Sequence, residues 1–79
     1  MPTKKEEKNL IKLQREFGAR IRKTRQSLNL TQEQLAKLSH MHRVNIAQIE
    51  SGEKNATIAV LKRLCDGMKV SLSKLFKGL

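Results

Sequence analysis

The stretch TQEQLAKLSHMHRVNIAQIESG, residues 31–52, contains the start and stop signals of two short helices separated by only a few residues. Thr31 and Gln34 have the spacing of a capping box, in which each side chain bonds the other residue's backbone N–H at the start of a helix. The closing glycine suits the position just after a helix, where the backbone turns left-handed. The stretch therefore predicts one helix that ends near residue 39 and a second that runs from residue 42 or 43 to the glycine.

The spacing of apolar residues indicates how these two helices pack. In the first helix we expect Leu35, Ala36 and Leu38 to face inward, and the small side chain of Ala36 lets the two helices approach closely. In the second helix only Ile46 and Ile49 form an inward stripe. This is the pattern of a helix-turn-helix, in which the core anchors the second helix so that its opposite face can enter a groove.

The outward face of the second helix is nearly uncharged, although the chain has 17 Lys and Arg against 7 Asp and Glu. A solvated face normally carries Lys and Glu, whereas this face carries Arg43, Val44, Asn45, Ala47, Gln48 and Ser51. The major groove of DNA presents donors, acceptors and thymine methyl groups, most of them uncharged. We therefore expect side chains of this face to read bases: Arg43 would bind guanine, Asn45 and Gln48 adenine, and Val44 and Ala47 thymine methyl groups.

Other roles remain open for three of these residues. Arg43 would otherwise contact a phosphate or be simply solvated. Val44 would otherwise belong to the core or to a dimer contact, and Asn45 would otherwise touch a phosphate.

Helical spacing continues before this stretch. Thr3 and Glu6 have the capping-box spacing. The apolar residues that follow are three to four apart and predict a long first helix ending near residues 27–29; they are Leu10, Leu13, Phe17, Ile21 and Leu28. Gly18 inside this helix indicates close packing or a break, because glycine weakens a helix interior.

Helical spacing also continues after the stretch. Thr57 would begin a fourth helix with an apolar stripe of Ile58, Leu61, Leu64, Cys65 and Met68. Ser71 would begin a short fifth helix that carries Leu72, Leu75 and Phe76. No stretch shows sustained strand-like alternation. The 79 residues therefore predict one all-α domain of five helices with tight connections.

The net charge of +10 favours a polyanionic partner, and its distribution is uneven. Residues 1–25 carry a net charge of +6 and residues 56–79 carry +4, whereas residues 31–55 carry equal numbers of basic and acidic groups. Positive charge thus flanks a neutral centre. This distribution would clamp phosphates around a more selective surface, or would simply keep the protein soluble.

Several other classes of protein are disfavoured. The single cysteine, Cys65, cannot form an internal disulfide and suits a reducing cytosol, so we expect a cytoplasmic protein. His40 and His42 have no nearby carboxylate or thiol partner, so we expect no metal site and no cofactor. No apolar run is long enough for a membrane span. An enzyme is disfavoured because the chain has no phosphate-cradling glycine loop and no recognisable Ser/Cys–His–acid set.

The segment from Phe17 to Phe76 resembles the Cro and phage-repressor type of helix-turn-helix transcriptional regulators, a lambda-repressor-like fold. The matching points are LTQ-x-x-LA at 30–36, I-x-x-IE-x-G at 46–52 and VSL-x-x-LF at 70–76. The run HRVNIAQIESGEKNATI and the chain length also resemble the controller proteins of restriction–modification systems. Residues 3–16 would then be an N-terminal helical extension of the family core.

The chain departs from this family at two positions. The family usually has glycine in the turn where this chain has His40, and often has glycine where it has Lys69. Each residue would then have to adopt a left-handed backbone, at a cost of about 1 kcal/mol for a non-glycine residue.

The resemblance implies further roles at the DNA backbone and in the fold. Gln32, at the positive end of its helix, would bind a phosphate, and Lys54 and Asn55 would contact a DNA strand. His42 would cap the second helix of the motif, with a DNA contact as the lesser alternative. Arg20, Arg22 and Lys23 would be outer phosphate ligands or diffuse charge. Arg25 and Glu50 match a structural pair that ties the first helix to the third in relatives of this fold.

Several apolar residues are not obviously used by a five-helix core. We expect Val60, Leu72, Phe76 and Leu79 to contribute to a homodimer seam. Leu10, Ile11 and Leu13 would either join that seam or cover the fifth helix or the back of the domain. A dimer would place two recognition helices about 34 Å apart, one turn of DNA, on a near-palindromic operator.

These observations favour a sequence-specific regulator of transcription that binds double-stranded DNA as a homodimer. The resemblance to controller proteins implies that the regulated genes are those of a restriction–modification operon. It would repress by blocking RNA polymerase or activate by touching it, and no small-molecule effector is evident. The alternative is a protein-interaction adaptor or antitoxin subunit that uses the same fold to grip a protein partner.

Overall fold

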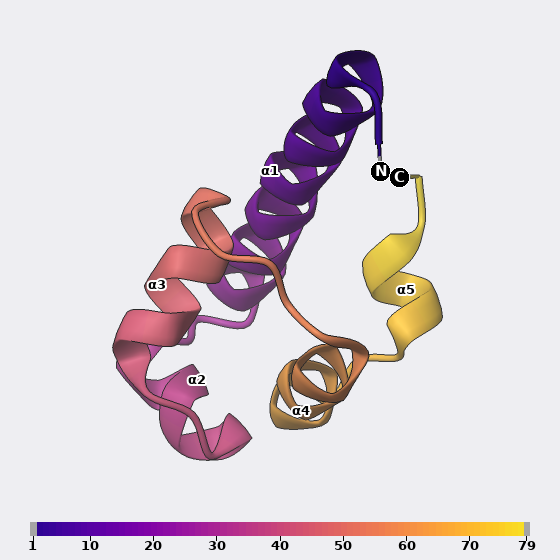
Figure 1. Cartoon of the computed structure of the whole chain (residues 1–79). Coiled ribbons are helices and arrows are strands. Elements are labelled where there is room, and N and C mark those ends of the chain that lie inside the picture. Colours follow the sequence, from indigo (N-terminus) through magenta and orange to yellow (C-terminus); the bar gives the residue numbers. More distant parts are fainter. Residues whose placement is uncertain (1, 79) are drawn as a thin grey trace.

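The computed structural model describes residues 2–78, and this part of the chain folds into five α-helices without strands (Figure 1). The helices are α1 (Lys4–Ser27), α2 (Gln32–Ser39), α3 (Arg43–Ser51), α4 (Ile58–Met68) and α5 (Leu72–Phe76). The all-α, five-helix architecture predicted from the sequence is thereby confirmed. Leu79, predicted to lie at a dimer seam, is outside the described residues.

Short hydroxyl side chains begin four of the helices, because they can accept a hydrogen bond from a backbone N–H that the first turn leaves free. At α2 both halves of the capping box form: Gln34 N–H donates to Thr31 Oγ1 at 3.0 Å, and Thr31 N–H donates to Gln34 Oε1 at 2.8 Å. At α1 the Thr3 hydroxyl accepts from the Glu6 N–H at 3.2 Å. Thr57 and Ser71 cap α4 and α5 in the same way.

The helices α2 and α4 each end at a residue with left-handed backbone, and these are the two positions where the family usually or often has glycine. His40 has φ 55° and Lys69 has φ 57°. Gly52, which ends α3, has φ 81° and adopts this conformation without strain because glycine has no Cβ atom. The predicted strain at His40 and Lys69 is therefore present.

The core lies where α2 and α3 meet the other helices. α1 packs on α3, α2 contacts both α3 and α4, and α5 lies against α1 and α4 (Figure 1). Among residues 2–78, ten apolar side chains are buried: Ile21, Leu35, Ala36, Ile46, Ile49, Leu61, Leu64, Cys65, Met68 and Leu75. The two inward residues predicted for α3, Ile46 and Ile49, are 0% and 4% exposed, so α3 is fixed to the core along one stripe.

Two residues expected to face inward are exposed instead. Leu38 is 52% exposed because Ser39, Leu35 and Ala36 occupy the inward side of α2. Ile58 is 77% exposed. It is the first residue of α4, and helical side chains lean toward the N-terminus, so its side chain extends past the end of the packed region.

The N-terminal end of α1 extends beyond the other helices (Figure 1). Leu10, Ile11 and Leu13 are about half exposed. Leu10 and Leu13 line a hollow of about 210 Å³ together with Phe17 and Phe76, whose ring centroids are 4.8 Å apart. Phe76, which was predicted to contribute to a dimer seam, is 43% exposed.

Candidate nucleic-acid interface

The residues predicted to read bases all lie on the outer side of α3. Arg43 and Val44 are exposed, and the remaining three, Asn45, Ala47 and Gln48, are half-buried; Ser51, on the same face, is exposed. The arrangement follows from the helical period, because Ile46 and Ile49 occupy the buried stripe and leave these positions on the opposite side. The structure therefore gathers the predicted set on one accessible face.

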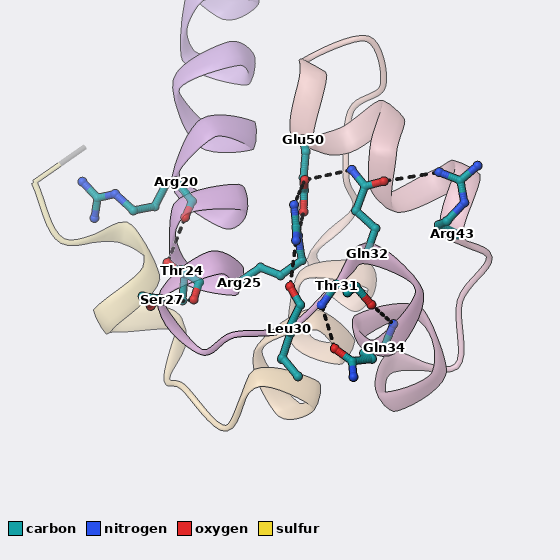
Figure 2. A network of polar contacts seen from close by, with 10 residues as sticks. All are labelled: Arg20, Thr24, Arg25, Ser27, Leu30, Thr31, Gln32, Gln34, Arg43 and Glu50. Atoms are coloured by element: carbon teal, nitrogen blue, oxygen red, sulfur yellow. Dashed lines mark hydrogen bonds and ion pairs between the residues drawn. The ribbon is translucent and has the colours of Figure 1, made fainter.

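A buried ion pair holds α3 to α1 beneath this face. Arg25 of α1 donates to Glu50 of α3 through two bonds, Nε to Oε2 at 2.7 Å and Nη2 to Oε1 at 3.0 Å (Figure 2). A third bond runs from Arg25 Nη1 to the Leu30 carbonyl at 2.8 Å, just before α2. Arg25 and Glu50 are 8% and 6% exposed. The predicted structural pair is thus present, and it also fixes the connection between α1 and α2.

Gln32 connects this ion pair to the outer face of α3. Its Nε2 donates to Glu50 Oε1 at 3.1 Å, and its Oε1 accepts from Arg43 Nη1 at 3.3 Å (Figure 2). Gln32 is the first residue of α2 and is half-buried. The sequence assigned Gln32 an intermolecular role only, because nothing in its local spacing indicates that Glu50 lies next to it.

The segment after α3 is fastened to that helix and lies at the edge of the same face. The N–H groups of Glu53 and Lys54 donate to the Gln48 carbonyl at 2.9 and 3.1 Å. Lys54 Nζ also donates to Asn45 Oδ1 at 3.3 Å. Asn55 is exposed beside it. Two residues expected to contact a DNA strand therefore lie next to the outer face, and one of them is bonded to a predicted base reader.

The remaining residues predicted to cap α3 or to bind phosphate lie in different surroundings. His42 occupies the position that starts α3 and is exposed, but its side chain makes no capping bond. Arg22 and Lys23 are exposed on α1. Arg20 differs from the expectation, because its guanidinium donates to the carbonyl groups of Leu75 and Lys77 at the C-terminal end of the fold.

The predicted dimer residues are divided between the core and the surface. Val60 and Leu72 are partly buried and pack against the core, whereas Phe76 is exposed beside Phe17. One further hydrogen bond was not predicted from the sequence. Gln14 Nε2 donates to the Gly52 carbonyl at 2.7 Å and so joins α1 to the end of α3. The two residues are 38 positions apart, and no local pattern marks such a bond.

Residues 2–78 contain neither a cluster of metal ligands nor a membrane-spanning helix. Within this range no three His, Cys, Asp or Glu side chains gather as the ligands of a metal ion would. Over the same residues no helix combines the length and apolar composition needed to cross a membrane. The Cys65 thiol is buried, and burial raises its pKa above the ordinary value, so it remains a packed, protonated group.

Comparison with known proteins places this arrangement among regulators. Residues 21–75 match the sequence profile described as helix-turn-helix. Over 55 residues the chain is 40% identical to control protein C.SmaI of Serratia marcescens, a match that covers 70% of this chain and 66% of that protein. It thus spans just under two thirds of the length of that relative. Control protein C.MunI of a Mycoplasma species is 31% identical over 64 residues, which cover 80% and 86% of the two chains.

A solved structure agrees with these relatives. The crystal structure of the restriction-modification controller protein C.AhdI from Aeromonas hydrophila superimposes with a TM-score of 0.77 at 31% sequence identity. The match covers 78% of this chain and 94% of that one. The resemblance inferred from the sequence motifs is therefore confirmed.

Proposed function

We infer that this chain, which belongs to the helix-turn-helix family, is a DNA-binding transcriptional regulator, and we propose that α3 reads the bases of its operator. The observation that carries the proposal is the outer face of α3. Arg43, Val44, Asn45, Ala47 and Gln48 lie there together, while Ile46, Ile49 and Glu50 fix the opposite side of the helix. A rigidly held helix with an accessible face of donors, acceptors and small apolar groups suits the major groove.

The proposed base contacts follow from side-chain chemistry. Arg43 has a fork of donors that matches guanine O6 and N7. Asn45 and Gln48 have the paired donor and acceptor that match adenine, and Val44 and Ala47 offer apolar contact to thymine methyl groups. The side-chain oxygen of Asn45 already accepts a hydrogen bond from Lys54 Nζ, and its amide NH₂ group remains available to donate to a base.

The proposed phosphate contacts come from α1, from the start of α2 and from the two ends of α3. Gln32 lies at the N-terminus of α2, where free N–H groups and the helix dipole favour an anion. The other members of the set are His42, Lys54, Asn55, Arg22 and Lys23. Arg20 is not a member of this set, because its guanidinium donates to the carbonyl groups of Leu75 and Lys77 at the end of α5. Phosphate contacts position the protein, whereas base contacts give specificity.

We further propose that the protein acts as a homodimer that controls a restriction–modification operon. The proteins C.SmaI, C.MunI and C.AhdI are named as control or controller proteins, which supports this narrower role. Exposed Phe76 and partly buried Val60 and Leu72 are the candidate seam residues. The alternative of a protein-interaction adaptor or antitoxin subunit gains no support from these relatives.

Selection of bound duplexes from a random pool tests the proposal directly. The expected winners are near-palindromes whose half-sites are about one DNA turn, roughly 34 Å, apart. Binding should be measured at near-physiological salt, because low salt exaggerates nonspecific affinity. A pool that shows no enrichment of any sequence would contradict base reading by α3. Enrichment of single half-sites would contradict the homodimer but leave base reading intact.

A further inference from the structure

One side of α1 is uniformly basic. The helix has nine Lys and Arg residues, of which two bond within the protein: Arg25 with Glu50, and Arg20 with the carbonyl groups at the end of α5. The other seven are exposed: Lys4, Lys5, Lys8, Lys12, Arg15, Arg22 and Lys23. An α-helix turns by about 100° per residue, and at that angle all seven point within about 100° of one another around the helix axis. No acidic residue of α1 points within this arc, which we call the basic face.

We propose that the basic face of α1 binds the phosphate backbone of the same DNA duplex that α3 reads, and so extends the contact beyond the helix-turn-helix. This inference rests on the proposed binding of duplex DNA by α3. Charge identifies the partner, because the closely spaced phosphates of DNA attract a row of Lys and Arg. Residues 4–20 precede the segment 21–75 that matches the helix-turn-helix profile, so five of the seven basic residues lie outside the family core.

The basic face is continuous with the candidate interface at the end of α3. Arg15 lies against Gly52, since a Cβ atom on residue 52 would be 2.6 Å from Arg15 Cγ. Ser51, which precedes Gly52, is exposed on the outer face of α3. Toward the C-terminal end of α1 the basic face continues to Arg22 and Lys23, which the proposed function already assigns to phosphates. The N-terminal lysines therefore extend a surface that is already directed at DNA.

The basic face also has the length of a contact with a DNA strand. From Lys4 to Arg22 the helix rises by about 27 Å at 1.5 Å per residue. Successive phosphates of one strand are about 3.4 Å apart along the DNA axis, so this length corresponds to about eight base pairs. α1 is one unbroken helix over the whole distance, and its N-terminal end extends beyond the other helices (Figure 1).

The basic face repels itself in the free protein. Residues three or four apart on a helix are neighbours, and like charges at this spacing are destabilising. Lys8 is four residues from both Lys4 and Lys12. Lys12 is in turn three residues from Arg15, and its exposed ion pair with Glu16 at 3.9 Å lies at the edge of the basic face. Solubility alone would be served equally well by Glu residues among the lysines, whereas bound phosphates relieve the repulsion.

The test replaces three residues of the basic face together: Lys4→Gln, Lys8→Gln and Lys12→Gln. Glutamine is a good helix former without charge, and Arg15 is retained because it packs against Gly52. Each phosphate contact contributes about 0.9 to the slope of log affinity against log salt concentration. On the duplex selected from the random pool we expect the slope to become shallower by about 2–3 for each protomer bound. The affinity at about 0.1 M salt should fall by about 10–100-fold.

The same variant separates phosphate binding from base reading. Affinity for random DNA should fall by the same factor as affinity for the selected duplex, because phosphates carry no sequence information. The sequence that the variant enriches from the random pool should therefore be unchanged. Ethylation of single phosphates then locates the contact. At the phosphates that bind the basic face, ethylation should weaken binding by the natural protein and leave binding by the variant unchanged.

A second triple variant provides the matched control. Lys62→Gln, Lys74→Gln and Lys77→Gln remove the same charge from exposed residues of α4 and of the C-terminal segment. Each triple variant breaks one exposed ion pair between residues four apart. The control should change the slope far less than the α1 variant does. Thermal unfolding at low salt establishes that both variants are folded, and the α1 variant should be at least as stable as the natural protein because it loses like-charge repulsion.

The outcomes separate this inference from the function on which it rests. Equal changes of slope in the two triple variants would overturn the inference, because net charge alone would then account for the effect, and so would an unchanged slope in the α1 variant. An unchanged slope together with lost binding to vesicles of anionic phospholipid would assign the basic face to a membrane surface instead. If the natural protein bound no duplex, the proposed function would fail and the inference with it. If it bound every duplex alike, only base reading by α3 would be wrong, and a shallower slope in the α1 variant would still support the inference.

Discussion

Gly18 of α1 lies against the backbone of α3 at Ile49. A Cβ atom on residue 18 would overlap the Ile49 carbonyl oxygen, and it would lie 2.7 Å from the carbonyl oxygen of Glu50. Gly18 is buried within an unbroken helix, so the glycine marks a close approach and not a break. The distance between α1 and α3 therefore depends on the absence of a side chain at this position.

Gly18→Ala should destabilise the protein, although alanine is the better helix former. The helix would gain about 1 kcal/mol, but the new methyl group would meet backbone atoms that cannot move without shifting α3. We expect a net loss of about 2 kcal/mol or more in the free energy of unfolding, measured by urea denaturation. Exposed Ala19 provides a matched control, since Ala19→Gly should cost only about 1 kcal/mol. A stabilised Gly18→Ala variant would mean that the two helices do not approach so closely.

Removal of one partner of the Arg25–Glu50 pair should be far more harmful than replacement of both. Arg25→Met would leave the Glu50 carboxylate buried without its charge partner, and we expect a loss of about 3–5 kcal/mol in the free energy of unfolding. The double variant Arg25→Met with Glu50→Leu should recover much of this loss, because no buried charge remains. Equal losses for the single and double variants would contradict this account. Glu16→Ala, in the exposed pair with Lys12, should have little effect.

His40→Gly should stabilise the protein, because residue 40 has φ 55° and only glycine adopts that conformation without strain. We expect a gain of about 0.5–1 kcal/mol in the free energy of unfolding. Lys37→Gly, at an exposed position inside the same helix, should instead cost about 1 kcal/mol. A His40→Gly variant that loses stability as Lys37→Gly does would show that the His40 side chain makes a compensating contact.

Arg43→Ala should reduce specific binding more than nonspecific binding. The variant loses the proposed guanine contact, so we expect discrimination between operator and random DNA to fall by about 1–3 kcal/mol of binding free energy. Lys23→Ala, at an exposed position on α1, should weaken both complexes about equally and reduce the salt dependence of binding. Titrations of both duplexes at several salt concentrations measure the two effects. A parallel loss of both affinities in Arg43→Ala would contradict base reading.

Stability should depend on pH through Cys65. Burial, and to a smaller extent the nearby Asp66 carboxylate, raises the pKa of the thiol above its ordinary value of 9.0. In the unfolded chain the thiol ionises at its ordinary pKa, whereas in the folded protein it stays protonated. The stability present below pH 9.0 is therefore lost as pH rises through the raised pKa of the folded state.

Urea denaturation at several values of pH between about 8 and 10.5 measures this loss, and Cys65→Ala supplies the control. The free energy of unfolding should fall more steeply with pH in the natural protein than in the variant. Identical slopes would mean that the folded protein does not suppress ionisation of this thiol.

Most local features of the fold were predictable from the sequence. The starts of α2, α4 and α5 follow from Thr31, Thr57 and Ser71, because a cap is a bond between residues three apart and its partners are visible in the spacing. The buried stripe of α3 follows from Ile46 and Ile49 for the same reason. The exposure of Ile58 was not predictable, because it depends on where α4 extends past the helices that it packs against.

In the candidate site, too, some features were predictable from the sequence and others depend on how the helices pack. Sequence alone assigned the outer face of α3, since the helical period separates it from the buried stripe, and it paired Arg25 with Glu50 through family resemblance. Only the tertiary structure brought Gln32 between Glu50 and Arg43, and only it turned Arg20 toward the end of α5. These bonds join residues 11 to 55 positions apart, so they exist only once the helices cross at particular angles. Local bonding specifies each helix, whereas helix packing decides which side chains from different helices can touch.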